Sequence, residues 1–234
     1  MNEFGQTVGF ALEGWSPPPT PPRKSLVGRY CQLEPLTATP HVQEMWDAES
    51  EPKGVGWTYM PFGPFASIDE FKQWGVEAEH SPDTQFHAII VAKQAVGFVA
   101  YTHIRPSHGV VEVGAYYSSQ LTKTRAATEA MYLAIANAFE LGYRRFEWKC
   151  DSCNLPSRNA AARFGFTYEG LFRQALVSRG RNRDSTWFSI IDNDWNNGLK
   201  EAYGRWLDPS NFDDQGQQKS KLSELTAPFV HARS

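Results

Sequence analysis

A short polar loop before a long helix is the part of the sequence best suited to bind an anion. Gly109 to Ser118 is predicted to form a strand, Ser119 to Lys123 a loop, and Thr124 to Leu141 a helix. The first-turn amides of a helix lack intrahelical partners, and the helix dipole adds about +0.5 charge at that end. Lys123 and Arg125 add two cationic side chains there. This combination predicts a site for a phosphate or pyrophosphate group.

The charge distribution agrees with such a site. Residues 120–190 carry 11 Lys and Arg against six Asp and Glu, a net charge of +5, whereas the rest of the chain carries −8. A basic half on a protein of net charge −3 favours a small polyanion, and we expect no nucleic-acid partner. Two plainer explanations stay open: a solvated basic face, and an ordinary strand–helix connection whose helix is capped by Thr122 or Thr124.

Two cysteines and two histidines form weaker patterns. Cys150 and Cys153 make one CxxC pair with no second pair and no thioredoxin-like context, so neither zinc nor redox chemistry is expected. His103 and His108 flank a predicted turn and lack the i, i+4 spacing of helical metal ligands. We therefore predict no metal site.

Three arginines and an aspartate lie between the last two predicted strands. They are Arg179, Arg181, Arg183 and Asp184. This loop could contact an acidic acceptor or a coenzyme, or it could be a solvated hairpin tip. The sequence alone leaves both explanations open.

The elements that must position these residues alternate between helical and strand periodicity. In chain order we predict helices at 40–49 and from Ser67, strands at 86–92, 96–102 and 109–118, a helix at 124–141, a strand at 144–151, a helix at 156–164, and strands at 166–177 and 186–191. Lys93 to Ala95 is predicted to join a hairpin, and Gly114 marks a bulge or close backbone approach inside its strand. This order predicts an α/β fold with a mixed sheet and helices on its faces.

A long segment of the chain, Glu112 to Gly170, resembles the core of the GCN5-related N-acetyltransferases (the GNAT superfamily), in its RimJ/RimL-like branch. Gln120 opens a loop similar to the family's Gln/Arg-x-x-Gly-x-Gly/Ala motif, and Asn154, Ser157 and the sequence Phe164-Gly165-Phe166 match its second signature. The resemblance implies a mostly antiparallel central sheet flanked by helices, with a splayed central strand pair.

The resemblance also implies acetyl-CoA as cosubstrate. The residues expected to bind it lie in and around the loop and before the later helix: Tyr117, Gln120, Leu121, Thr122, Lys123, Thr124, Arg125, Ala126 and Asn154. Lys123 and Arg125 stand where the family has glycines. A side chain strains a turn with φ > 0, but a cation can hold phosphate by charge.

The chemistry implied by the family is direct transfer of acetyl to an amine in a ternary complex, which requires proton transfers from the amine and to the thiolate. Glu112 matches a frequent family carboxylate and is the candidate base. It could instead be a structural carboxylate paired with a nearby Arg. Ser157 matches a serine placed near the coenzyme A sulfur, or it is an ordinary residue in the first turn of its helix.

Aromatic residues are expected to line the acceptor site. Four come from the loop at 57–65 and one from the central strand: Trp57, Tyr59, Phe62, Phe65 and Tyr116. Core packing is the alternative for some of them. RimL-type enzymes can carry a glutamate where this chain has Leu176. We therefore do not expect this chain to acetylate a ribosomal protein. The acceptor is predicted to be a small-molecule amine or a protein or peptide N-terminus.

The ends of the chain differ from its middle. We predict a Pro-rich arm at 1–28, an acetyltransferase domain at 29–195, roughly 70% of the chain, and a polar C-terminal extension at 196–234. Three cysteines, no signal-peptide pattern and no apolar run of about 18 residues predict a cytoplasmic protein without a membrane partner. A homodimer is left open. The competing function is a catalytically silent acyl-CoA-binding module.

Overall fold

The centre of the protein is an eight-stranded mixed sheet. The computed structural model describes residues 1–50 and 54–231. The strands lie in the order β1-β2-β3-β4-β5-β6-β8-β7. Their bounds are Leu26–Val27 (β1), Gln32–Pro35 (β2), Gln85–Val91 (β3), Gln94–Arg105 (β4), Val110–Tyr117 (β5), Arg145–Asp151 (β6), Thr167–Ser178 (β7) and Arg181–Ile191 (β8). Neighbouring strands are antiparallel except β5 and β6, which are parallel, as predicted for a mostly antiparallel sheet.

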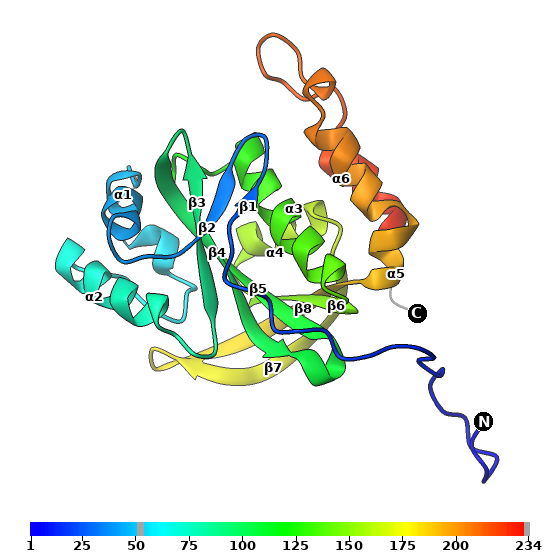
Figure 1. Ribbon diagram of the computed structural model, residues 1–234. Helices are drawn as coiled ribbons and strands as arrows, with labels where there is room; N and C mark the ends of the chain where they lie inside the picture. Colours follow the sequence, from blue (N-terminus) through cyan, green and yellow to red (C-terminus); the bar gives the residue numbers. More distant parts are fainter. Residues whose placement is uncertain (51–53, 232–234) are drawn as a thin grey trace.

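Helices cover both faces of the sheet (Figure 1). The bounds are His41–Asp47 (α1), Ile68–Glu79 (α2), Arg125–Glu140 (α3), Leu155–Arg163 (α4), Asp192–Asp194 (α5), Lys200–Leu207 (α6) and Leu222–Thr226 (α7). Residues of α3 and α4 pack with Val99, Val111 and Val113 in one large hydrophobic cluster. Residues of α1 and α2 pack with Phe98 and Ala100 in a second, aromatic cluster on the opposite face. Strand alternation explains this division, because successive side chains point to opposite faces.

The predicted helices and strands are confirmed, with two differences. The last strand, predicted at 186–191, begins at Arg181 because its pairing with β7 continues to Ser178, so Arg181, Arg183 and Asp184 lie in β8 and not in the loop. The β3–β4 hairpin turns at Ala92 and Lys93, whose φ values are 49° and 69°, rather than at Lys93 to Ala95. Two consecutive residues with positive φ form the turn that matches the twist of a two-residue hairpin. The sequence pattern did not reveal β1 and β2, because both are short strands that carry little periodicity.

Helix α3 begins and ends as its sequence predicts. The Thr124 side chain accepts a hydrogen bond from the Ala127 amide (3.1 Å) and so caps the first turn. At the other end, Gly142 has a φ of +95° and its amide bonds the Phe139 carbonyl, which closes the C-terminal cap. The alanines between them are buried against the sheet and allow close approach of the helix backbone.

The C-terminal segment packs on the same face as α3 and α4. Trp206 and Leu222 belong to the large cluster. The Tyr203 hydroxyl donates to the Phe164 carbonyl (2.8 Å), and the Thr226 hydroxyl donates to the Arg163 carbonyl (3.2 Å). Short helices lie on either side of the polar loop at 211–220. Figure 1 shows these orange and red helices beside α3 and α4, and the dark blue N-terminal arm running away from the sheet. The segment at 196–234 is described as far as residue 231.

Candidate active site

The two central strands separate at Gly114. The parallel pairing of β5 with β6 runs from Val110↔Arg145 to Val113↔Trp148. Beyond that point β5 continues to pair with β4 as far as Tyr117, and β6 continues to pair with β8 as far as Asp151. A Cβ built on Gly114 would have a single neighbour within 4 Å, the Thr102 methyl at 3.7 Å. The strands therefore form the splayed pair that the resemblance implied, with open space at the glycine.

The β5–α3 loop has a residue with positive φ at the position of the first expected glycine. Lys123, at the first expected glycine, has a φ of +64°. A non-glycine residue in this region is uncommon and costs about 1 kcal/mol or more. The Leu121 and Thr122 amides both donate to the Ser118 carbonyl at 3.0 Å, which holds the turn. The loop therefore places a cation in the left-handed backbone region at the position where the family has its first glycine.

The other predicted loop residues divide between structural and exposed positions. Leu121 and Ala126 are buried in the large cluster, so they can meet a ligand only through their backbone. The Tyr117 hydroxyl donates to the Ala127 carbonyl (3.1 Å). Gln120 is exposed. Thr124 caps the helix, which confirms the capping explanation without deciding whether the same helix end binds an anion.

Arg125 packs on two aromatic rings, Tyr30 near β2 and Phe212 in the C-terminal segment. Its guanidinium carbon is 3.9 Å from the Phe212 ring centroid and 5.7 Å from that of Tyr30. Phe212 belongs to the C-terminal segment, so a cation predicted to face pyrophosphate also stacks on an aromatic ring. Lys123, by contrast, makes no ion pair with any residue in the described parts of the chain. Of the two cations, Lys123 has the freer side chain.

Glu112 lies two residues before the splay and is buried, with 7% of its surface exposed. Its Oε2 lies 3.0 Å from Lys149 Nζ and 3.3 Å from His103 Nδ1. Val111 and Val113 point into the large cluster, so Glu112 points to the opposite face. The predicted partner was an arginine, and the observed partners are a lysine and a histidine.

Ser157 and Asn154 lie on the α4 face of the same gap. The Asn154 side chain accepts from the Ser157 amide (3.1 Å) and caps α4. The Ser157 hydroxyl accepts from Trp148 Nε1 (3.1 Å), and Trp148 is the last β6 residue paired with β5. Ser157 is thus a first-turn residue of α4, as the plainer explanation expected, and it also lies beside the splay.

The predicted acceptor-lining aromatics pack mostly against one another. Trp57 stacks on Tyr116 with ring centroids 4.1 Å apart and an interplanar angle of 12°. Both rings are buried in the aromatic cluster, and Phe62 and Phe65 pack against it. Tyr59 is the most exposed of the five, at 37%. Trp57 and Tyr116 are therefore core residues, and their rings are not exposed surfaces of an acceptor site.

A hydrogen bond to Glu49 completes the environment of Tyr116. The Tyr116 hydroxyl donates to Glu49 Oε2 at 2.8 Å. Burial and the neighbouring carboxylate raise the pKa of the Tyr116 phenol well above its usual range. The phenol therefore stays protonated and cannot serve as a base at neutral pH.

Arg179 connects the tip of the β7–β8 hairpin to the aromatic loop, which the sequence did not reveal. Its guanidinium donates to the carbonyls of Trp57, Thr58, Met60, Phe62 and Gly63. In Figure 1 the yellow hairpin extends beneath the sheet towards the side on which α2 lies. The hairpin tip is therefore hydrogen-bonded to the aromatic loop and is not simply solvated. The signal was the Arg179-Gly180 turn, but its partner carbonyls carry no side-chain signature.

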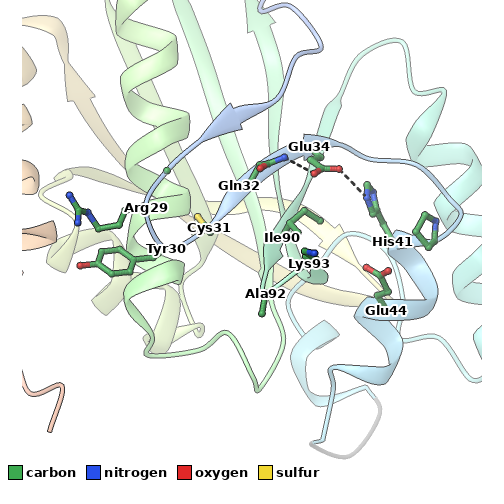
Figure 2. A pocket seen from close by; sticks show the side chains of 12 residues that line it. Arg29, Tyr30, Cys31, Gln32, Glu34, His41, Glu44, Ile90, Ala92 and Lys93 are labelled. Carbon is green, nitrogen blue, oxygen red and sulfur yellow. Dashed lines mark hydrogen bonds and ion pairs between the residues drawn. The ribbon is translucent and has the colours of Figure 1, made fainter. Parts of the chain in front are cut away.

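The pocket shown in Figure 2 lies elsewhere, between the β1–β2 turn, the β3–β4 turn and α1. Its volume is about 450 Å³, and its lining includes Arg29, Glu34, His41, Glu44 and Lys93. Glu34 bonds Gln32 and pairs with His41, as the dashed lines show. The residues predicted for acetyl transfer do not line it.

The described residues contain no group of three or more His, Cys, Asp or Glu able to hold a metal ion. Cys150 is buried beside Thr186 and Cys153 is exposed, and both are free thiols. Over the same parts of the chain, we find no helix with the length and apolar character that crossing a membrane requires.

Comparison with known proteins agrees with this geometry. Residues 31–167 match the family model of the acetyltransferase (GNAT) domain. The chain belongs to the GNAT family. A crystal structure of a GCN5-related N-acetyltransferase from Brucella melitensis is 44% identical, with a TM-score of 0.89, over 92% of this chain and 100% of that one. A GNAT-family protein from Chromobacterium violaceum is 38% identical, with a TM-score of 0.76, over 82% and 98% of the two chains.

More distant GNAT structures show the same fold. The ribosomal L7/L12 acetyltransferase RimL, solved with coenzyme A, is 19% identical with a TM-score of 0.61, over 71% of this chain and 96% of that one. The search of curated proteins finds no match. The family and the fold together establish this chain as a GNAT-family N-acetyltransferase.

Proposed function

We propose that this GNAT protein transfers acetyl from acetyl-CoA directly to a primary amine, of a small molecule or of a protein or peptide N-terminus. The observation that carries the proposal is the position of the two catalytic candidates. Glu112 faces one side of the sheet, Ser157 lies on the other side against Trp148, and the β5–β6 gap lies between them. A thioester entering from the α3–α4 face would meet an amine arriving from the opposite face.

The residues around the gap fit coenzyme A. Gly114 leaves open space where β5 and β6 no longer bond each other, so a pantetheine arm can pair with backbone groups. The first-turn amides of α3 and the Lys123 ammonium form a cationic end for the pyrophosphate. When bound, acetyl-CoA supplies the acetyl group in activated thioester form.

Glu112 is the proton acceptor in this proposal. Lys149 and His103 fix its Oε2, which leaves Oε1 to take a proton from the amine as nitrogen attacks the acetyl carbon. His103 is 62% exposed in its side chain and gives the carboxylate a route for proton exchange with solvent. A peptide α-amine, with a pKa of ~7.7–8.0, needs this base less than an alkyl amine of pKa ~10.4.

Ser157 is the candidate donor to the departing thiolate. Its oxygen accepts from Trp148, so its own O–H remains available to donate to the sulfur as the carbon–sulfur bond breaks. Each of the two proton-transfer residues is therefore held in place by another side chain: Glu112 by Lys149, and Ser157 by Trp148. Positioning of this kind can supply ~7–11 kcal/mol of the barrier reduction.

The acceptor is expected on the face that carries Glu112, Tyr59 and the β7–β8 hairpin. Leu176 replaces the glutamate that RimL-type enzymes can carry, and the RimL structures share only the fold with this chain. We therefore do not propose a ribosomal protein as acceptor. Three free cysteines fit a reducing cytoplasm, which we propose as the location.

The competing proposal is a catalytically silent acyl-CoA-binding module, favoured by Lys123 and Arg125 in place of loop glycines. Calorimetry with coenzyme A and acetyl-CoA tests binding, and thiol release with a panel of amines tests turnover. We expect both. Binding without turnover would support the silent module, and no binding of either nucleotide would contradict both proposals.

A further inference from the structure

One face of β8 carries a row of three side chains whose buried polar atoms lack hydrogen-bond partners among the described residues. Phe188 and Ile190 point into the large cluster, so Arg183, Ser185 and Trp187 point to the opposite face, the face of Glu112. The Nε of Arg183, the Oγ of Ser185 and the Nε1 of Trp187 are each buried and have no hydrogen-bond partner among the described residues. Ser185 has 1% of its surface exposed.

Buried polar atoms without partners are rare in native proteins, and each costs about 1–3 kcal/mol. Three of them at alternate positions of one strand form a set rather than an isolated defect. Each can donate: the guanidinium and indole N–H groups only donate, and the serine hydroxyl does both. A ligand that satisfies the row must therefore offer hydrogen-bond acceptors.

The row lies beside the reactive end of the splay. Trp187 is in register with Lys149, and Ser185 with Asp151, both beyond the last residue pair that joins β6 to β5. Lys149 Nζ lies 5.0 Å from the Trp187 ring centroid and 3.0 Å from Glu112 Oε2. The Phe172 ring, 5.1 Å away, packs on Trp187 from β7. The indole is thus held close to the candidate base.

The row is also cationic. Arg183 makes no ion pair with a carboxylate in the described parts of the chain. The two acidic residues nearest to it in the strand pairing have other partners: Asp151 accepts from the Cys153 amide (2.8 Å), and Asp184, on the opposite face, accepts from the Gln174 amide (2.7 Å). A guanidinium with N–H and O–H donors around it matches a carboxylate.

We propose that Arg183, Ser185 and Trp187 bind a carboxylate carried by the amine acceptor, several ångströms from its amine. This inference rests on the proposed function and names its substrate class. Lys149 Nζ lies 3.0 Å from Glu112 Oε2 and 5.0 Å from the Trp187 ring centroid, and Ser185 lies two residues, about 7 Å, farther along the same face of β8. A carboxylate at this row and an amine at Glu112 therefore require a spacer rather than an α-amino acid. Aminocarboxylates and acidic peptides satisfy this requirement.

The test uses three matched probes on the full chain saturated with coenzyme A: 6-aminohexanoate, 6-aminohexanamide and hexylamine. The indole N–H signal of Trp187 in ¹H–¹⁵N spectra is assigned by its loss in Trp187→Phe. We expect 6-aminohexanoate to shift this signal and to bind at least tenfold more tightly than hexylamine, with the amide weaker than the acid. Thiol release from acetyl-CoA should rank the three amines in the same order.

Variants complete the design. Arg183→Gln and Ser185→Ala should each weaken 6-aminohexanoate binding, whereas Arg173→Gln, which makes the same charge change near Asp184 on the other face, should not. If Arg183→Gln does not fold, Arg183→Lys and Ser185→Ala carry the comparison. An unshifted Trp187 signal, or equal binding of acid and hexylamine, would overturn the carboxylate site. Coenzyme A affinity, measured by calorimetry in every variant, separately reports on the proposed function.

Discussion

Lys149 Nζ lies 3.0 Å from Glu112 Oε2, and this ion pair joins the two central strands just where they part. Glu112 is on β5 one residue before the last pair with β6, and Lys149 is on β6 one residue beyond it. The lysine also lies over the Trp187 ring. One cation therefore positions the candidate base and borders the row of donors on β8.

Replacing Glu112 with Gln tests its role as base. For an alkyl amine acceptor, we expect kcat/KM at neutral pH to fall by about 10²–10⁴, because general-base assistance is lost. Raising the pH should recover much of the loss, since the amine then deprotonates in solution. The measurement is thiol release between pH 6.5 and 9.5.

The matched control is Glu147→Gln. Glu147 is a buried carboxylate directly opposite Glu112, paired with Arg105 and Arg145. Its replacement should lower stability and leave the shape of the pH profile unchanged. If Glu112→Gln loses the same factor at every pH, Glu112 positions the substrate or the strand and is not the base.

Lys123→Gly separates the strain of the loop from its charge. We expect the free energy of unfolding to rise by about 1 kcal/mol, because glycine accepts the φ of +64° without strain. The dissociation constant for coenzyme A should change little and lose part of its dependence on salt. Lys123→Ala should weaken binding, because it removes the charge and, unlike glycine, does not restore the close backbone approach of the family loop.

Lys93→Gly provides the control for this pair. Lys93 has a φ of 69° in the β3–β4 turn, so the same substitution should stabilise the protein by a similar amount. Coenzyme A affinity and its salt dependence should not change. A loss of affinity in Lys93→Gly equal to that in Lys123→Ala would remove the argument for a local anion site.

Gly114→Val should damage coenzyme A binding more than stability. A Cβ at Gly114 meets only the Thr102 methyl, at 3.7 Å, so the valine enters the gap and not the core. At Gly97, on the neighbouring strand, a Cβ would clash with the Tyr116 carbonyl oxygen. Gly97→Val should therefore lower the melting temperature strongly. Calorimetry and thermal unfolding of both variants measure the contrast, and equal losses of stability would favour a purely structural Gly114.

Arg179→Ala should release the aromatic loop. Its charged hydrogen bonds to loop carbonyls contribute about 1.5–3 kcal/mol each before non-additivity, and we expect a net loss of about 2 kcal/mol in unfolding free energy. Limited proteolysis should cut the loop at 54–65 faster. Arg181→Ala, an exposed arginine two residues away, should change neither readout by a measurable amount. Protease resistance equal to that of the wild type would show that the loop is held by its aromatic contacts alone.

His87 should make the fold sensitive to mild acid. Burial lowers the pKa of His87 from 6.5 to about 4. The unfolded chain therefore binds a proton between these values and the native protein does not. Stability is fully present above pH 6.5 and is lost as the pH falls towards 4, by up to about 3 kcal/mol. Urea unfolding at pH 7, 6 and 5 should show the loss.

The variant His87→Gln should flatten this dependence. His80→Gln, at an exposed histidine after α2, should retain the wild-type slope. A slope in His87→Gln as steep as in the wild type would assign the acid sensitivity to other groups.

The elements near the site follow from short-range sequence signals. The extent of α3 and its Thr124 cap depend on contacts within a few residues, so the sequence predicted the helix and offered the correct cap. Gly114 was predicted to mark a bulge or a close backbone approach, and the resemblance implied a splayed strand pair; the strands part at this glycine. The GNAT motifs supplied the family because Asn154, Ser157 and the Phe164 to Phe166 sequence retain their spacing.

The partners of the site residues came only from the tertiary structure. Glu112 pairs with a lysine 37 positions later rather than an arginine, because the parallel β5–β6 pairing selects its neighbour. Arg179 reaches carbonyls more than 110 positions earlier, and backbone acceptors leave no trace in residue type. The sequence placed Arg183 in a loop and did not single out Ser185 or Trp187; only the structure shows that these three donors lie on β8 without hydrogen-bond partners among the described residues. Local periodicity fixes which face a side chain takes, whereas only the packing of distant strands decides what stands opposite it.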